Sequence, residues 1–181
     1  MDVRPDIQIA SMIKAMTEIV LPAVDTENKL AQEQTRLVIA TLQLVAKRLP
    51  LAYRYDRDEL ERYVRLAREL IAALDADLAP MLLTELETLT THSADVLERA
   101  RAEPAEMEAA IFDLRARVGE LIAQTRASGD QQAREAVWRL VLVASKQELD
   151  RERALVVDIG FEADPADMPA PIEQLLSPVG R

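Results

Sequence analysis

The chain has 181 residues and a mass of 20.2 kDa, and 22 Lys and Arg against 32 Asp and Glu give it a formal net charge of −10. It has no cysteine and a single histidine, His92, which excludes disulfides, cysteine-ligated metals, thiol catalysis and any site that needs two histidines from one chain. The acidic balance argues against a nucleic-acid partner, because phosphate recognition needs clustered Lys and Arg.

Apolar residues recur every three or four positions along almost the whole chain, and only four glycines interrupt them. This period predicts an all-α protein. Prolines and one glycine divide the pattern into about six helices, whose short connections make sequence neighbours antiparallel. We therefore expect an up-and-down bundle of about five long helices plus a short N-terminal helix. It should form one domain over residues 1–160, followed by an acidic, proline-rich tail at 161–181.

The first two expected helices cover roughly residues 5–21 and 26–49. Pro22 should end or kink the first helix, and Asp25 or Thr26 should cap the second. Two apolar stripes run along the second helix, which predicts burial on two sides. The stripes are Leu30, Leu37 and Leu44, and Ala31, Val38, Leu42, Val45 and Leu49.

Residues 50–55 are expected to connect the second helix to a third, which Asp56 or Asp58 should cap. In the third, fourth and fifth helices, apolar residues recur at alternating intervals of four and three residues. This 4-3 step is the seam pattern of left-handed bundle packing. Pro80 interrupts the chain between the third and fourth helices, and Pro104 stands where the fifth should begin.

Residues 128–131, Ser-Gly-Asp-Gln, predict a helix stop followed by a capping box in which Ser128 and Gln131 form the reciprocal pair. The sixth helix should run from about 131 to 159. Its middle, residues 137–144, is apolar on almost all sides, which predicts the most buried helix. The tail ends in a small apolar cluster that is disordered, straps along the bundle or docks on a partner. This cluster comprises Ile172, Leu175 and Leu176.

Patterns that support catalysis are missing from the sequence. No Glu-x-x-His pair, Gly-x-Ser-x-Gly elbow or glycine-rich phosphate loop occurs, so we expect no cofactor, no metal and no catalytic residue. His92 is expected to be exposed or half-buried on a helix, beside threonines that bond back to their own helix. Asp95 and Glu98 are the only paired carboxylates expected in mid-helix, since the other pairs lie at helix starts where the macrodipole accounts for them. A magnesium-dependent hydrolase that gathers these two carboxylates inside the bundle is the weakest alternative.

A basic and aromatic cluster offers a ligand-binding alternative. Arginine and tyrosine together can hold an anionic head group at the rim of an interior pocket. Interleaved acidic residues favour instead a solvated, salt-bridged helix face. The candidate ligand-binding residues are Tyr53, Arg54, Arg57, Arg62 and Arg65.

Other residues favour protein association. Gln34 and Thr41 occupy seam positions of the second helix, where polar residues set register or partner choice. Trp138 and Arg139 are adjacent, and tryptophan and arginine are residue types enriched at interface hot spots. We therefore predict a non-enzymatic cytoplasmic protein that associates with itself as a homodimer or with a protein partner, without nucleic acid or membrane. A bundle that binds a small apolar or anionic ligand in an interior pocket is the alternative.

Overall fold

The computed structural model describes residues 4–99, 103–157 and 167–176, and this part of the chain holds helices and no β-strand. The all-α prediction is confirmed, and five of the helices have 19 residues or more. The chain divides into two compact units. Unit 1 comprises Met1–Ala52 with Glu152–Ala170, and unit 2 comprises Tyr53–Arg151 with Pro171–Arg181. No helix within the described residues is both long enough and apolar enough to cross a membrane.

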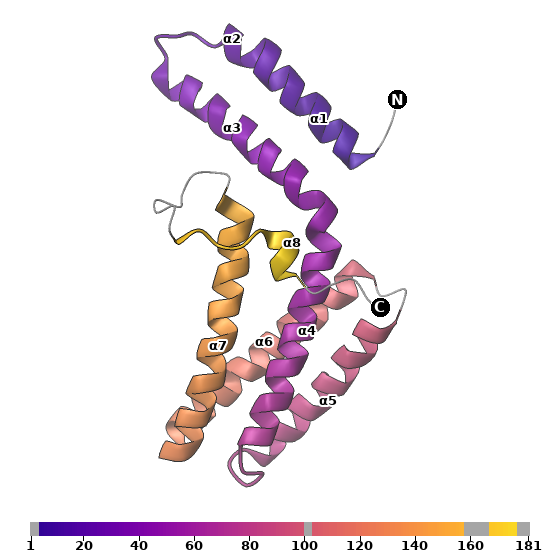
Figure 1. Cartoon of the computed structure of the whole chain (residues 1–181), viewed down its shortest axis with the longest axis vertical. Helices are drawn as coiled ribbons and strands as arrows, with labels where there is room; N and C mark the ends of the chain where they lie inside the picture. The colour runs from indigo at the N-terminus through magenta and orange to yellow at the C-terminus, as the bar shows by residue number, and fades with distance from the viewer. Residues whose placement is uncertain (1–3, 100–102, 158–166, 177–181) are drawn as a thin grey trace. The chain divides into compact units, whose positions relative to one another are not determined.

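Unit 1 contains a helical hairpin. Its first arm is α1 (Pro5–Ala15), the π-helical turn η1 (Met16–Val20) and α2 (Leu21–Ala23), and its second arm is α3 (Lys29–Arg48) (Figure 1). The first arm ends at Ala23, one residue past Pro22, which was expected to end or kink it. Pro22 has no N–H to donate four residues back, and η1 precedes it, with the Leu21 N–H donating to the Met16 carbonyl.

The cap of α3 differs from the prediction. Asn28 caps the helix, its Oδ1 accepting from the Ala31 N–H at 3.0 Å. Asp25 Oδ1 accepts instead from the Glu27 N–H at 3.0 Å, within the preceding turn. The prediction of Asp25 or Thr26 as the cap was wrong because the Asp25 carboxylate stabilises the turn rather than the helix.

The expected two-sided burial of α3 was also wrong. Only Gln32 and Ile39 of this helix are buried, and α1 contributes only Ile9. The first arm of the hairpin covers one face of α3, and a second apolar face of α3 remains exposed. Gln32 is buried with a partner, since its Nε2 donates to the Val24 carbonyl at 2.8 Å.

Residues 50–55, expected as a connector, are helical. The 3₁₀ turn η2 (Leu49–Leu51) follows α3 and leads directly into α4 (Ala52–Ala73). Pro50 is tolerated because it lies in the first turn of η2, where its missing N–H has no helical partner to lose. Asp56 and Asp58 therefore do not cap α4, and Asp58 is buried in its second turn.

Unit 2 is an antiparallel bundle of α4, α5 (Pro80–Glu98), α6 (Pro104–Ala127) and α7 (Gln131–Val156), with α7 included up to Arg151 (Figure 1). The predicted 4-3 stripes supply its core. Pro80 and Pro104 are the first residues of α5 and α6, so the predicted interruption at Pro80 and the predicted helix start at Pro104 are confirmed. Fully buried side chains of this core include Leu60, Leu70, Leu86, Val96, Met107, Leu114 and Leu121.

The junction between α6 and α7 is a turn built on Gly129, whose φ of 76° lies in the left-handed region that glycine adopts without strain. The predicted stop is therefore confirmed, but the capping box is not. Asp130 caps α7, its Oδ1 accepting from the Ala133 N–H at 3.0 Å. Ser128 Oγ donates back to the Thr125 carbonyl at 2.9 Å, so it does not pair with Gln131.

The prediction that α7 is the most buried helix was wrong. Its buried stripe includes Ala133, Val137 and Arg151, whereas Trp138 is 63% exposed and Leu142 is 50% exposed. A four-helix bundle covers one stripe of each member, so the second apolar face of α7 has no cover from the described residues.

The acidic tail is described only from residue 167 to 176, and residues 158–166 and 177–181 lie outside the described part. The last six of these described residues belong to unit 2, where Ile172 and Leu176 are buried around the short helix α8 (Ile172–Leu175). Arg54 donates to the carbonyls of Glu173 and Leu176 at 3.0 and 3.1 Å. This segment is therefore a strap within unit 2.

Candidate functional sites

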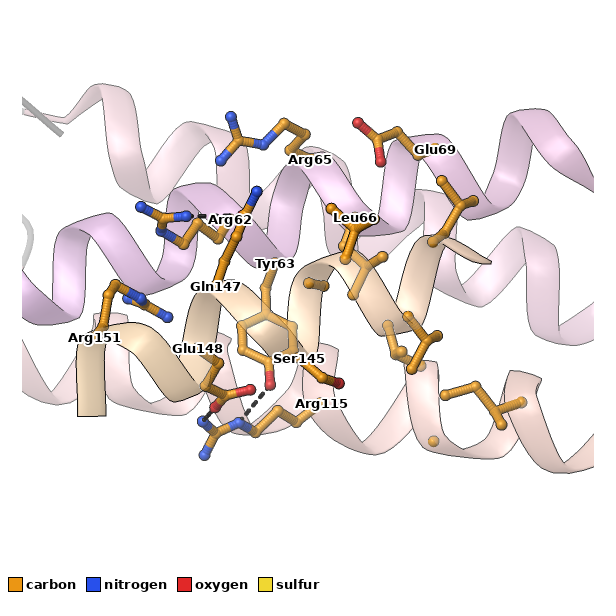
Figure 2. A pocket seen from close by; sticks show the side chains of 17 residues that line it. Arg62, Tyr63, Arg65, Leu66, Glu69, Arg115, Ser145, Gln147, Glu148 and Arg151 are labelled. Carbon is orange, nitrogen blue, oxygen red and sulfur yellow. Dashed lines mark hydrogen bonds and ion pairs between the residues drawn. The ribbon is translucent and has the colours of Figure 1, made fainter. Parts of the chain in front are cut away.

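A pocket of about 430 Å³ opens in unit 2, lined by α4, α6 and α7 (Figure 2). Its volume lies in the range of small-molecule sites. One part of its wall is apolar, formed by Leu66, Val118, Ile122, Leu140, Val141 and Ala144. Another part carries the charged side chains Arg62, Arg65, Glu69, Arg115, Glu148 and Arg151.

A buried ion cluster lies at the charged end. Asp58 Oδ2 accepts from Arg62 Nε at 2.7 Å and from Arg151 Nη1 at 2.9 Å. The side chains of Asp58 and Arg151 are only 1% and 3% exposed. The Arg151 guanidinium also lies over the Tyr55 ring, 5.2 Å from its centroid. Charges buried this deeply depend on their partners, because desolvation of each ion costs several kcal/mol.

Arg151 keeps one unused donor. Its Nε is buried and has no hydrogen-bond partner among the described residues. Buried polar atoms in proteins almost always have a partner, so an orphaned guanidinium N–H calls for an acceptor. Arg151 lines the pocket together with Gln147 and Arg62, and Figure 2 shows the three side chains gathered at one end of it.

Arg115 organises the neighbouring wall. Its Nε donates to the Tyr63 hydroxyl at 2.8 Å, and its Nη2 donates to Glu59 and Glu148. Burial raises the pKa of Glu59 above its ordinary value, against the opposing effect of Arg115. Burial likewise raises the pKa of Tyr63. Burial opposes the charge on Arg115, yet its bonds to these groups raise its pKa, so it stays a cation.

The structure separates the five predicted ligand residues. Arg62 and Arg65 line the pocket. Arg57 donates to the Leu97 carbonyl at 2.6 Å, Arg54 holds the C-terminal strap, and Tyr53 is exposed outside the pocket lining. Arginines close in sequence on one helix point in different directions, so only part of the cluster converges.

The sequence prediction missed Arg115, Gln147 and Arg151. A signal for Arg151 was present, because it continues the 4-3 stripe of Val137, Leu140, Ala144 and Gln147 along α7. An arginine in register with a core stripe indicates a buried charge. Arg115 follows the core residue Leu114 and carries no such signal.

Acidic side chains do not form a metal site in the described ranges, where no group of three or more His, Cys, Asp or Glu could hold an ion. Asp95 and Glu98 are exposed on α5 instead of meeting inside the bundle, and Asp95 pairs with Arg99 at 3.0 Å. His92 is exposed as expected, and Thr91 beside it donates to the Glu87 carbonyl at 2.9 Å.

The second candidate site is the exposed face of α3 in unit 1. Leu30 and Leu37 are 68% and 58% exposed, and Val38 and Val45 are also exposed. The predicted interface residues Gln34 and Thr41 are exposed on the same helix. The predicted pair Trp138 and Arg139 is exposed too, but on α7 in unit 2, with Leu142 and Leu149 on the same helix.

No protein-family model, curated protein or solved structure matches this chain.

Proposed function

We propose that this protein is a non-enzymatic association module that forms a homodimer through the exposed apolar face of α3. The observation that carries the proposal is the row of large apolar side chains left uncovered on this helix, Leu30, Leu37, Val38 and Val45. Exposed apolar patches of this kind mark interaction surfaces in soluble proteins. Two helical hairpins that share such faces form a four-helix bundle.

The order of residues along α3 favours a second copy as the partner. In a two-fold symmetric interface, residue i contacts j′ and residue j contacts i′. An axis passing between Leu37 and Val38 of two antiparallel α3 helices brings Leu37 opposite the partner subunit's Val38. The same axis brings Leu30 opposite the partner subunit's Val45. Every exposed apolar residue of the row then meets another apolar residue.

The polar seam residues fit the same register. Gln34 falls opposite the partner subunit's Thr41, so the two polar positions meet each other instead of an apolar side chain. Polar layers of this kind fix register and orientation at some cost in stability. Gln34 and Thr41 are therefore proposed to choose this pairing over slipped ones.

The charge distribution also supports self-association. Residues 1–52 contain six acidic and six basic side chains, so this segment is electrically neutral, although the whole chain has a formal net charge of −10. Two copies of a strongly acidic chain repel each other through most surfaces. The α1–α3 hairpin carries no net charge of its own and so adds little to that repulsion.

Sedimentation equilibrium of the full chain tests the proposal. We expect a species of twice the 20.2 kDa chain mass, and a monomer for Leu37→Glu, which places a charge at the centre of the seam. Met81→Glu, at a 76% exposed position of α5 in unit 2, is the matched control and should remain dimeric. A monomeric wild type across the accessible concentrations would contradict the proposal. So would a dimer that Trp138→Glu dissociates and Leu37→Glu does not, since the interface would then lie on α7.

We also propose a cytoplasmic location. The absence of cysteine is compatible with it, since the fold has no disulfide that an oxidising compartment would maintain. Fractionation of cells that express the tagged full chain tests it, and recovery in a membrane or secreted fraction would contradict it.

A further inference from the structure

We propose that the pocket in unit 2 binds an amphipathic monocarboxylate, with its carboxylate at Arg151 and its alkyl chain along the apolar wall. This site is independent of the proposed dimer, because every lining residue lies between positions 62 and 151 of unit 2. The ligand class follows from three features of the pocket.

The first feature is the unsatisfied donor. Arg151 Nε is buried without a partner, although Nη1 of the same side chain donates to Asp58 at 2.9 Å. Gln147 also lines the pocket, where its Oε1 accepts from Arg62 Nη1 at 2.8 Å. A carboxylate supplies the acceptor oxygen that Arg151 Nε lacks.

The second feature is the sign and size of the charge. Four arginines line the pocket against Glu69 and Glu148, so the lining carries more cationic than anionic groups in an acidic chain. Asp58 and Glu59 behind the lining pair with Arg62, Arg151 and Arg115 and offset this excess, so four carboxylates balance the four arginines. A ligand of low charge, such as a monocarboxylate, therefore fits this balance better than a polyanion. A dianionic phosphate would lie near Glu148 and would be repelled by it.

The third feature is the apolar wall. Leu140 and Ala144 of α7 precede Arg151 on the same helix, and Leu140 lies about 16 Å from Arg151 along the helix axis. Val118 and Ile122 of α6 line the pocket as well. An alkyl chain that runs from Arg151 toward Leu140 removes its own surface from water and covers these side chains.

Gly119 offers a way to close the pocket without damage to the fold. It lines the pocket on α6, and a Cβ added there meets no atom within 4 Å. Glycine is also a poor helix former in the middle of a helix. The Gly119→Leu side chain should therefore fill the pocket. The midpoint temperature of thermal unfolding of this variant should equal that of the wild type or exceed it.

Isothermal titration calorimetry of the full chain tests the inference, with decanoate and 1-decanol as probes that share a ten-carbon chain. We expect decanoate to bind at least tenfold more tightly than decanol, and Gly119→Leu to weaken decanoate binding at least tenfold. Ala123→Leu, which adds the same side chain to an exposed position of α6 outside the pocket lining, should bind as the wild type does. Equal affinity for the two probes would overturn the carboxylate at Arg151. No binding, or binding that Gly119→Leu leaves unchanged, would overturn the site.

Discussion

Asp58 offers a direct test of the buried ion cluster in unit 2. Asp58→Asn keeps the shape of the side chain but removes its charge, so Arg151 becomes a buried cation that has lost its hydrogen-bonded counter-ion. The Arg62 side chain is 21% exposed and can turn to water, but that of Arg151 is 3% exposed and cannot. Removal of one partner from a buried pair typically costs about 3–5 kcal/mol. We expect a loss of about 3 kcal/mol in the free energy of unfolding, because asparagine still accepts hydrogen bonds.

Asp95→Asn is the matched control. Asp95 near the end of α5 and its C-cap residue Arg99 form an Asp-to-Arg pair with the same four-residue spacing, at 3.0 Å, but their side chains are 65% and 42% exposed. Ion pairs exposed to this degree contribute about 0.3–0.5 kcal/mol to the free energy of unfolding. The two substitutions share chemistry and the four-residue spacing, so the difference between their effects measures the burial of Asp58 together with its second partner, Arg151.

Urea denaturation at a fixed protein concentration measures both variants. Fluorescence of Trp138, the single tryptophan of the chain, reports on unit 2, and far-ultraviolet circular dichroism reports on the helices together. The double variant Asp58→Asn/Arg151→Met removes the stranded cation and should be more stable than Asp58→Asn alone. A loss for Asp58→Asn within about 0.5 kcal/mol of that for Asp95→Asn would refute the reasoning, since a pair that exchanges freely with water carries no burial cost.

Two further predictions concern a buried carboxyl and a helix cap. Because burial raises the pKa of Glu59 in the folded state, its contribution to stability is greatest below its unfolded pKa and is lost as pH rises through the folded value. Relative to the wild type, Glu59→Gln should therefore gain stability between pH 4 and pH 7, and a relative loss in urea titrations over that range would contradict the sign. Asp130→Ala removes the acceptor of the Ala133 N–H and should cost about 1 kcal/mol in thermal or urea unfolding. Ser128→Ala should cost less, and the reverse order would restore Ser128 as the cap.

The spacing of apolar residues was enough to predict most of the bundle. The 4-3 stripes of α4, α5 and α6 are buried as expected, because a repeat near 3.5 residues keeps one face of a helix against its neighbours. Pro80, Pro104 and Gly129 also marked their boundaries correctly, because proline suits a first helical turn and glycine adopts the left-handed conformation of a helix stop.

The spacing of apolar residues could not decide between neighbouring residues that can fill the same cap or turn position. Asp25, Thr26 and Asn28 can all cap a helix, and only the backbone conformation makes Asn28 the residue whose side chain reaches a free N–H. Pro50 was expected to separate two helices, but proline is compatible with a 3₁₀ turn that carries the chain into α4. These choices depend on differences of about 1 kcal/mol between neighbouring residues, which composition does not resolve.

The candidate pocket was predictable only in part. The amino-acid sequence by itself determined an all-α chain, its helix-breaking positions and the absence of cysteine and paired-histidine chemistry, because these depend on residue type and local period. The tertiary structure decided which apolar faces are covered and which arginines converge. Asp58 and Arg151 lie 93 residues apart and meet only when α4 packs beside α7. Periodicity states that a face is apolar, but only the fold determines whether another helix covers it.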